Sequence, residues 1–247
     1  GEALLRRLDE EGVKVDAVGQ VTGSAKYTDD FTLPRMLYGK ILRSPHAHAR
    51  ILSIDTSKAE KLPGVIAVMT GKDLPIRYGI LPASQDETAL CVDKVRFVGD
   101  GVAAVAAVDE LTAQEALKLI RVQYEPLPPV LSIKDALRSE LPKIHEGTNY
   151  TNNTAMHVAL EFANVDEGFA EADYVREDEF YYGANTHAML EPHAALASFE
   201  PPKSSDSYKD GYLTLWSATR TPHYVHRTLA KVLEMPASHI RVIKPQL

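Results

Sequence analysis

The stretch Ile41-Leu-Arg-Ser-Pro-His-Ala-His-Ala-Arg-Ile-Leu-Ser-Ile-Asp55 decides how the first half of the chain folds. It contains an apolar run, a polar corner and a second apolar run. Pro45 has a fixed φ and biases Ser44 toward an extended backbone, so the chain must turn there. The pattern predicts a strand, a tight turn and a second strand.

Two histidines, His46 and His48, lie two positions apart in this corner. In an extended backbone that spacing places both rings on one face, either as a metal pair or as hydrogen-bonded histidines of a packed corner. We favour the packed corner, because two ligands do not complete a metal site. No Cys, Asp or Glu stands between Ile41 and Ile54 to supply a third.

The composition bounds the class of protein. The 247 residues, 45% of them hydrophobic, suffice for one large domain or two ordinary ones. The net charge of −7 argues against nucleic acid or an anionic membrane as partner. The single cysteine, Cys91, cannot form an internal disulfide or hold an iron–sulfur cluster. No apolar run approaches the roughly 20 residues of a membrane span, and residues 1–9 are too charged for a signal peptide, so a cytoplasmic location is expected.

The first 145 residues predict a charged lead followed by one domain of strands and turns. The lead covers residues 1–16, and the domain covers 17–145, punctuated by Gly and Pro. Besides the corner, strands are predicted at 65–70, 94–98, 102–108 and 121–124, helices at 57–62, 111–120 and 132–137, and a surface excursion at 76–89. Thr56 or Ser57 is the expected cap of the first helix and Thr112 that of the second, whose apolar face includes Leu111.

The turn Gly99-Asp-Gly101 has two interpretations. We favour a hairpin turn between two core strands. The alternative is a tight turn that lets another backbone or a cofactor approach closely.

The polar run at 146–154 predicts a linker, because its Asn and Thr residues leave almost nothing to bury. A second domain is then expected at 155–247. It has predicted strands at 155–162, 174–182, 194–200, 211–216 and 240–243 and helices at 166–172 and 223–233. The segment 211–216 is expected to pair back onto 194–200 across an exposed loop.

The residues His187, Glu191 and His193 have the composition of a facial metal triad, two imidazoles and a carboxylate. Pro192 breaks any helix that would align them. We therefore favour a buried polar network in which backbone or side-chain donors hold the Glu191 carboxylate, and we assign no metal ligands. The sequence contains no Ser-centred elbow, no His-Glu-x-x-His and no glycine-rich phosphate loop.

Several segments resemble, in order, the molybdopterin-binding subunit of the molybdenum hydroxylase family, which includes xanthine dehydrogenase, aldehyde oxidase and carbon monoxide dehydrogenase. The similar segments are 21–30, 41–55, 62–68, 93–100 and 122–128, within a resemblance that covers 13–247. Within the family the chain is most similar to the 4-hydroxybenzoyl-CoA reductase branch. The resemblance implies an α+β fold, with an α/β hammerhead domain at 17–145, a linker at 146–154 and the first part of a mixed α+β molybdopterin-binding domain at 155–247.

The resemblance also implies site residues. Glu191 corresponds to a position near the floor of the cofactor site. The segment 215–223 corresponds to a strand and turn that normally reads Thr-Gln-x-Pro-His, whose Gln donates a hydrogen bond to an oxo group on molybdenum. Here Arg220 stands at the Gln position, between Thr219 and Thr221. A guanidinium donates but cannot accept. Arg220 is therefore expected to donate to the cofactor or the substrate, and the alternative is an arginine that points to solvent or pairs with an acidic neighbour.

The rest of the enzyme, by the same resemblance, supplies a glycine-rich cofactor loop and a catalytic glutamate beyond Leu247. The chain alone is therefore expected to be inactive. The implied cofactor is molybdopterin with molybdenum, with the cytosine dinucleotide as one form, and electrons pass through [2Fe–2S] clusters and FAD on partner chains. The implied partners are the remaining molybdopterin-subunit polypeptide, an iron–sulfur subunit and an FAD subunit.

The implied reaction is two-electron hydroxylation or reductive dehydroxylation of an aromatic or acyl-CoA substrate. Two alternatives stay open. One is a xanthine or aldehyde dehydrogenase of the same family, and the other is a non-catalytic scaffold or assembly module.

Overall fold

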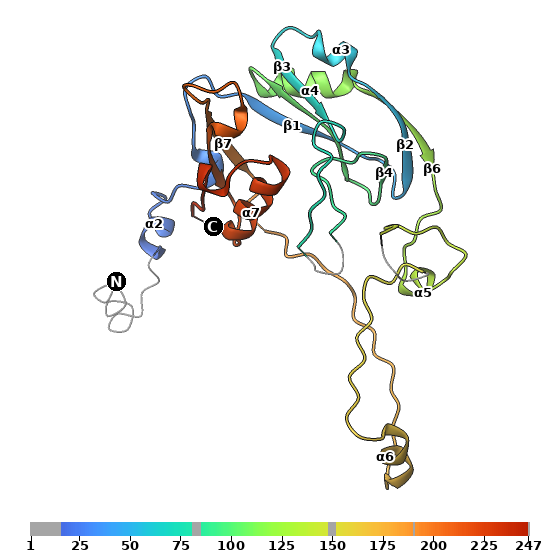
Figure 1. The fold of residues 1–247 in the computed structure, drawn as a ribbon. Helices are drawn as coiled ribbons and strands as arrows, with labels where there is room; N and C mark the ends of the chain where they lie inside the picture. Colours follow the sequence, from blue (N-terminus) through green and yellow to red (C-terminus); the bar gives the residue numbers. More distant parts are fainter. Residues whose placement is uncertain (1–15, 81–84, 148–151, 190, 247) are drawn as a thin grey trace.

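The computed structural model describes residues 16–80, 85–147, 152–189 and 191–246. The predicted lead at 1–15, four residues of the predicted excursion (81–84), four of the predicted linker (148–151), Leu190 and Leu247 lie outside the described residues. Figure 1 shows three parts: two sheets with helices at the top, a smaller sheet with α7 beside them, and a long arm that reaches away from both.

The first sheet has the order β1-β5-β3, with β1 at Tyr38–Arg43, β5 at Gly101–Ala107 and β3 at Val65–Thr70, all antiparallel. The central β5 is the continuous apolar run that predicted a buried strand. Helices α3 (Ser57–Glu60) and α4 (Glu110–Leu119) pack against this sheet. The strand predicted at 65–70 is confirmed, but the expectation that it is buried is wrong, because none of its residues is buried and Ile66 is exposed.

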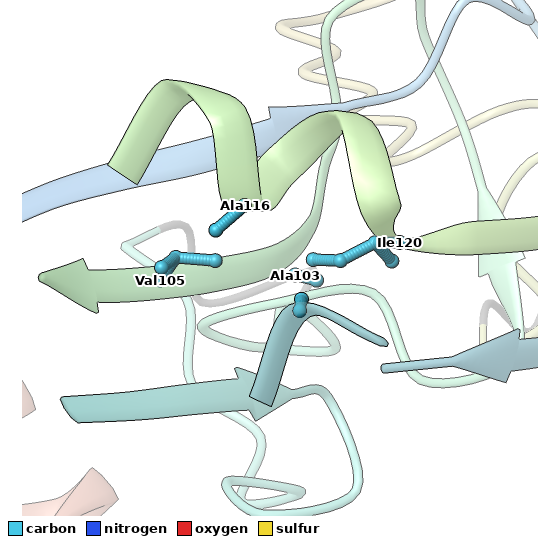
Figure 2. Close-up of a cluster of buried hydrophobic side chains, with 5 residues drawn as sticks. Ala103, Val105, Ala116 and Ile120 are labelled. Atoms are coloured by element: carbon cyan, nitrogen blue, oxygen red, sulfur yellow. The ribbon is translucent and has the colours of Figure 1, made fainter. Parts of the chain in front are cut away.

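The core under α4 is built from small side chains. Ala103 and Val105 of β5 meet Ala116 and Ile120 at the helix, with Ala59 of α3 beside them (Figure 2). Alanines let the helix approach the strand closely, so the cluster excludes water although its side chains are short. The predicted helix is therefore confirmed, but Leu111 lies outside its buried face, which Ala113 and Ala116 form instead.

The second sheet has the order β4-β2-β6, with β4 at Lys94–Val95, β2 at Ala49–Asp55 and β6 at Arg121–Pro126. The predicted strand, turn and strand at 41–55 are confirmed. However, β1 and β2 do not pair with one another, because the corner between them carries the chain from one sheet to the other.

The two histidines of the corner have separate packing roles. His48 is buried, and its Nδ1 lies 3.0 Å from the carbonyl oxygen of Pro128. The His46 ring packs edge-on against Tyr124, with 4.8 Å between the ring centroids. Burial lowers the pKa of His48, so its ring is neutral near pH 7. The packed-corner interpretation therefore describes this pair.

The favoured hairpin at Gly99-Asp-Gly101 is wrong, because β4 and β5 belong to different sheets. The loop instead pairs with the corner: the Ser44 N–H donates to the Asp100 carbonyl and the Gly99 N–H donates to the Ser44 carbonyl, both at 2.8 Å. Gly99 has a φ of +95°, which suits glycine. The turn thus admits another backbone, as in the alternative interpretation.

The strand predicted at 94–98 is also shorter than expected. Only Lys94 and Val95 pair, Phe97 is exposed, and the Lys94 side chain is 3% exposed. The Lys94 ammonium donates to the Lys143 carbonyl at 2.8 Å and pairs with the Glu146 carboxylate. It is therefore a buried anchor for residues 143–146 and not part of a solvated face.

Helix caps differ from the expected ones at two places. Asp109, not Thr112, caps α4, because its carboxylate accepts the Thr112 N–H at 2.7 Å. At α3, the N-cap Thr56 makes no side-chain cap bond, and the Asp55 carboxylate accepts the Ser57 N–H at 3.0 Å instead. Carboxylates are the stronger acceptors at these positive helix ends.

The remaining short elements of the first half are helical. They are α2 (Ala17–Val21), η1 (Thr28–Asp30) and α5 (Ile133–Ala136). The short apolar runs separated by Gly and Pro from Ala17 onward predict strands and turns, whereas the structure has α2 at the start of this region. Helix α5 is confirmed, and the Ser132 hydroxyl caps it by accepting the Asp135 N–H.

The third sheet has the order β7-β8-β9, with β7 at Ala195–Glu200, β8 at Tyr212–Ser217 and β9 at Ile240–Ile243. β7 and β8 are antiparallel, as predicted, and β9 is parallel to β8. Leu213, Met235 and Ile240 form its core with α7 (Pro222–Val232). The short elements η2 (Tyr208–Asp210) and η3 (Ala237–His239) lie in its loops.

The arm, residues 155–189, departs from the prediction. Helix α6 (Val165–Glu171) is present at its far end, capped by the Asn164 side chain (Figure 1). The strands predicted at 155–162 and 174–182 are wrong for this structure, because neither segment belongs to a ladder among the described residues. Both are extended, which is the conformation their alternation favours, but a strand needs a partner. No helix in the described ranges has the length and apolarity that a membrane span requires.

Candidate functional site

The candidate site lies at one end of the β7–β8–β9 sheet. The register pairs Ala195 with Ser217, and the Ala218 N–H extends this ladder by donating to the Ala194 carbonyl at 3.1 Å. The segment that contains Glu191 enters the sheet at the point where the segment 219–221 leaves it. Two of the segments singled out in the sequence are thus brought to one edge.

The end of β9 joins them. β9 is parallel to β8, with Trp216 opposite Ile243, so residues 244–246 leave the sheet at the same edge. The Gln246 side chain donates to the Asp16 carboxylate at 2.5 Å. The carboxyl ends of two parallel strands and the start of a helix therefore meet here, a place where many α/β proteins bind ligands.

The turn before α7 presents polar groups to this edge. The Thr219 hydroxyl accepts the Thr221 N–H at 3.1 Å, and the two threonine hydroxyls lie 3.4 Å apart. Thr221 is the N-cap of α7 but makes no side-chain cap bond, and Pro222 follows it. The Thr221 hydroxyl therefore does not cap the helix itself.

Arg220 is exposed on the same turn, and within the described ranges its guanidinium has no hydrogen bond or ion pair. Of the alternative to a donor role, the solvent-facing arginine agrees with this exposure, and a pairing with an acidic neighbour is not found among those residues. Its charge adds to the positive end of the α7 dipole, and such a combination favours an anion.

Glu191 is the acidic member of the site. Both of its carboxylate oxygens are buried and have no hydrogen-bond partner in the described part of the chain. The predicted network of donors is therefore not supplied by those residues. A buried carboxylate without donors is unfavourable, so the Glu191 carboxylate is available to a donor from outside the described residues.

The metal triad is not assembled. His187 and His193 are exposed, whereas the Glu191 oxygens are buried. In the described ranges no three His, Cys, Asp or Glu side chains are grouped as metal ligands.

A second polar pocket, of about 420 Å³, lies in the first half of the chain and was not foreseen from the sequence. It is lined by Tyr78, Asp86, Glu87, Thr88, Ala89, Cys91, Arg96, Phe97, Asp100 and His145. His145 Nδ1 lies 2.6 Å from an Asp86 carboxylate oxygen. Burial raises the pKa of the Cys91 thiol well above its usual range, so the thiol is a protonated core group and not a nucleophile.

Comparisons with known proteins agree with the geometry. The aldehyde oxidase and xanthine dehydrogenase a/b hammerhead domain matches residues 22–128, and the molybdopterin cofactor-binding domain matches residues 144–247. The fold and these domains define a molybdopterin-binding polypeptide. The chain belongs to the xanthine dehydrogenase/aldehyde oxidase family, as part of its molybdopterin-binding subunit.

Two curated relatives are similar over nearly the whole chain. One is a probable xanthine dehydrogenase subunit of Bacillus subtilis (strain 168), 39% identical over 235 residues, which are 94% of this chain and 29% of that protein. The other is the nicotinate dehydrogenase large molybdopterin subunit of Eubacterium barkeri, 37% identical over 239 residues, which are 96% of this chain and 53% of that protein.

Among solved structures, quinoline 2-oxidoreductase from Pseudomonas putida 86 has a TM-score of 0.79 and 31% identity, over 95% of this chain and 30% of that one. The chain thus spans 29% to 53% of the length of these three proteins.

Proposed function

We propose that this chain is part of the molybdenum-cofactor subunit of an oxidoreductase, and that the edge formed by Glu191 and residues 219–221 contacts molybdopterin. The observation that carries the proposal is the Ala218–Ala194 hydrogen bond, 3.1 Å, which brings the two segments together. The match of 144–247 to a molybdopterin cofactor-binding domain supports it.

The polar groups at this edge fit the cofactor's chemistry. A pterin ring has amide and amine N–H donors, and its side chain and metal carry anionic oxygens. The buried carboxylate of Glu191, which has no partner among the described residues, is an acceptor for such donors. The guanidinium of Arg220, for which the described ranges likewise show no partner, is a donor for the anionic oxygens. When bound, the cofactor supplies two-electron redox chemistry with oxygen transfer.

In this proposal the residues of this chain bind and orient the cofactor or the substrate. Arg220 holds a permanent positive charge and donates to an oxygen of the cofactor or of the substrate, but it cannot accept as a glutamine can. Thr219 and Thr221 supply hydroxyls on either side of it. A preorganised donor aimed at developing negative charge is worth about 100-fold or more in rate.

We assign the catalytic base and the electron-transfer centres to polypeptide outside residues 1–247. The catalytic base is a glutamate that this chain does not contain. Cys91 alone cannot hold a cluster. As the resemblance implies, we place the electron path in [2Fe–2S] clusters and FAD on partner subunits. The cofactor form includes the cytosine dinucleotide, and the location is cytoplasmic. The relatives named as subunits support a multi-subunit enzyme.

The proposed substrate is aromatic or an acyl-CoA, as in 4-hydroxybenzoyl-CoA reductase. The relatives named for nicotinate and quinoline act, by those names, on aromatic heterocycles, which supports the aromatic half of the proposal. Arg220 supports the acyl-CoA half, because a guanidinium pairs with phosphates and polarises a thioester carbonyl.

The test is purification of the complete enzyme, analysis of its molybdenum and pterin, and turnover with aromatic heterocycles, aldehydes and aryl-CoA thioesters. We expect about one molybdenum per molybdenum-binding subunit and turnover of an aromatic or aryl-CoA compound. A complete enzyme that lacks molybdenum and pterin would contradict the proposed function. Turnover of aldehydes alone would contradict the proposed substrate class.

A further inference from the structure

The arm exposes an unusual amount of apolar surface. Phe162 is 86% exposed, Phe180 89% and Tyr181 95%. The other exposed large apolar side chains of the arm are Met156, Val158, Leu160, Val165, Phe169, Tyr174, Val175, Tyr182 and Met189. Exposed apolar surface of this extent on a protein marks an interaction site.

The first extended segment carries its apolar side chains at alternate positions. Met156, Val158, Leu160 and Phe162 follow a period of two, which puts them on one face of an extended backbone. Ala159 and Glu161 fall on the opposite face. This is the pattern of a strand with one face packed on a core.

The two extended segments of the arm, 155–163 and 173–189, pair with no strand among the described residues. An extended pair without a third strand or a covering layer is marginal at best in water. The absence of a ladder in the described ranges and the exposed apolar face of 156–162 therefore both favour another sheet as the occupant.

We propose that the arm is a docking element whose two extended segments add as strands to a sheet formed by the remaining polypeptide of the molybdenum-binding subunit. This proposal rests on the proposed function, because the sheet that it invokes belongs to the remainder of the molybdenum-binding subunit. This chain spans 29% of the Bacillus subtilis relative and 30% of quinoline 2-oxidoreductase, so most of such a subunit lies outside the structure.

The position of the arm supports the same occupant. The arm lies inside residues 144–247, which match one molybdopterin cofactor-binding domain, so its partner belongs to that domain. The arm also stops two residues before Glu191, whose two buried oxygens lack partners in the described ranges. One incoming sheet would cover the arm and complete the edge at which Glu191 lies. Strand addition supplies backbone hydrogen bonds, and the alternate side chains supply specificity.

Hydrogen exchange of the complete enzyme and of this chain alone tests the proposal. We expect amides of 155–162 and 174–182 to exchange at least about ten-fold more slowly in the complete enzyme, while those of β5 are slow in both. Fast exchange of both segments in the complete enzyme would overturn it. Equally slow exchange in this chain as a dimer would also overturn it, because the occupant would then be a second copy.

The accessibility of single cysteines tests which face of the segment 156–162 is packed. M156C, V158C and L160C are compared with A159C and E161C in the complete enzyme; the native Cys91 is buried. We expect maleimide to label the first three at least about ten-fold more slowly than the last two. Equal labelling at all five positions would contradict an alternating packed face. A complete enzyme that protects the arm but contains no molybdenum would contradict the proposed function alone.

The yield of complete enzyme gives an independent test of the proposed docking face. Leu160→Asp places a charge on the packed face, and Ala159→Asp places the same charge on the opposite face as a matched control. Because Leu160 is 80% exposed in this chain, neither change should alter its own folding, which circular dichroism checks. We expect at least about ten-fold less complete enzyme with L160D than with A159D. Equal yields would count against the docking face.

Discussion

The backbone of Ala218 donates to the carbonyl of Ala194 at 3.1 Å, and this one bond extends the β7–β8 ladder past its last paired residues. It holds the turn that carries Arg220 against the segment that carries Glu191. The two residues are far apart in the sequence and opposite in charge. Arg220 offers hydrogen-bond donors and Glu191 offers acceptors, so the two residues suit different parts of one ligand.

Arg220 is predicted to act as a donor in turnover. In the complete enzyme, Arg220→Ala should lower kcat/KM by about 100-fold or more, because a preorganised donor is lost. Arg220→Gln should cost less, since an amide still donates. The matched control is Arg227→Ala on α7, whose guanidinium lies 4.7 Å from the Tyr224 ring centroid. An Arg220→Ala enzyme within a few-fold of the parent removes Arg220 from the site.

The buried Lys94 ammonium is predicted to need Glu146. Glu146→Gln should lower the free energy of unfolding by about 1 kcal/mol, a small value because the Glu146 side chain is 60% exposed and solvent screens it. Lys94→Met should cost less than Glu146→Gln, because it removes the buried charge itself. Urea unfolding of both variants measures this. A larger loss of unfolding free energy with Lys94→Met would show that the methylene stem of Lys94, and not its charge, contributes most to stability.

The same pair predicts a pH dependence. Burial alone would raise the pKa of Glu146, but the hydrogen bond and charge of Lys94 outweigh it and lower that pKa below its ordinary 4.5. The stabilisation is therefore present above pH 4.5 and is lost as the pH falls through the lowered value. Unfolding free energies from pH 6 to 3 should converge for the parent and Glu146→Gln. Parallel curves would contradict the assignment.

Gly71 is predicted to tolerate no side chain. A Cβ there would lie 2.3 Å from the Cys91 carbonyl oxygen and 2.6 Å from its carbon, both backbone atoms that cannot move aside. Gly71→Ala should therefore lower the free energy of unfolding by about 3 kcal/mol. Gly39→Ala in β1 is the control, because a Cβ there meets nothing within 4 Å. Equal stabilities in urea would show that the Cys91 segment is free to shift.

Several elements follow directly from local sequence. The apolar run of β5 and the helical spacing of α4 predict both elements, because each buries one face on a neighbour close in sequence. The burial of Lys94 could not be predicted, since it depends on Glu146 and on the Lys143 carbonyl, both distant along the chain. The Gly99 turn could not be predicted either, because glycine chemistry is the same in a hairpin and in a crossing between sheets.

The candidate site was only partly predictable. The pairing of β7 with β8 follows from alternation, but the parallel placement of β9, which completes the edge, has no local signal. Spacing singles out Glu191, but as part of a metal triad that is not assembled, and the resemblance alone points to a cofactor role for Glu191 and Arg220. The alternation in the arm correctly favours an extended backbone, but pattern alone does not say which strand it pairs with. The domain boundary at 146–154 stays a prediction.

Molybdenum retention by Glu191→Ala in the complete enzyme tests the central claim most directly. The buried carboxylate has no partner in the described part of the chain, and its proposed partner is the cofactor. With assembly of the enzyme confirmed by gel filtration, the account predicts that its molybdenum and pterin content falls about ten-fold or more relative to the parent and to Arg227→Ala. Parental molybdenum and pterin in Glu191→Ala would contradict it.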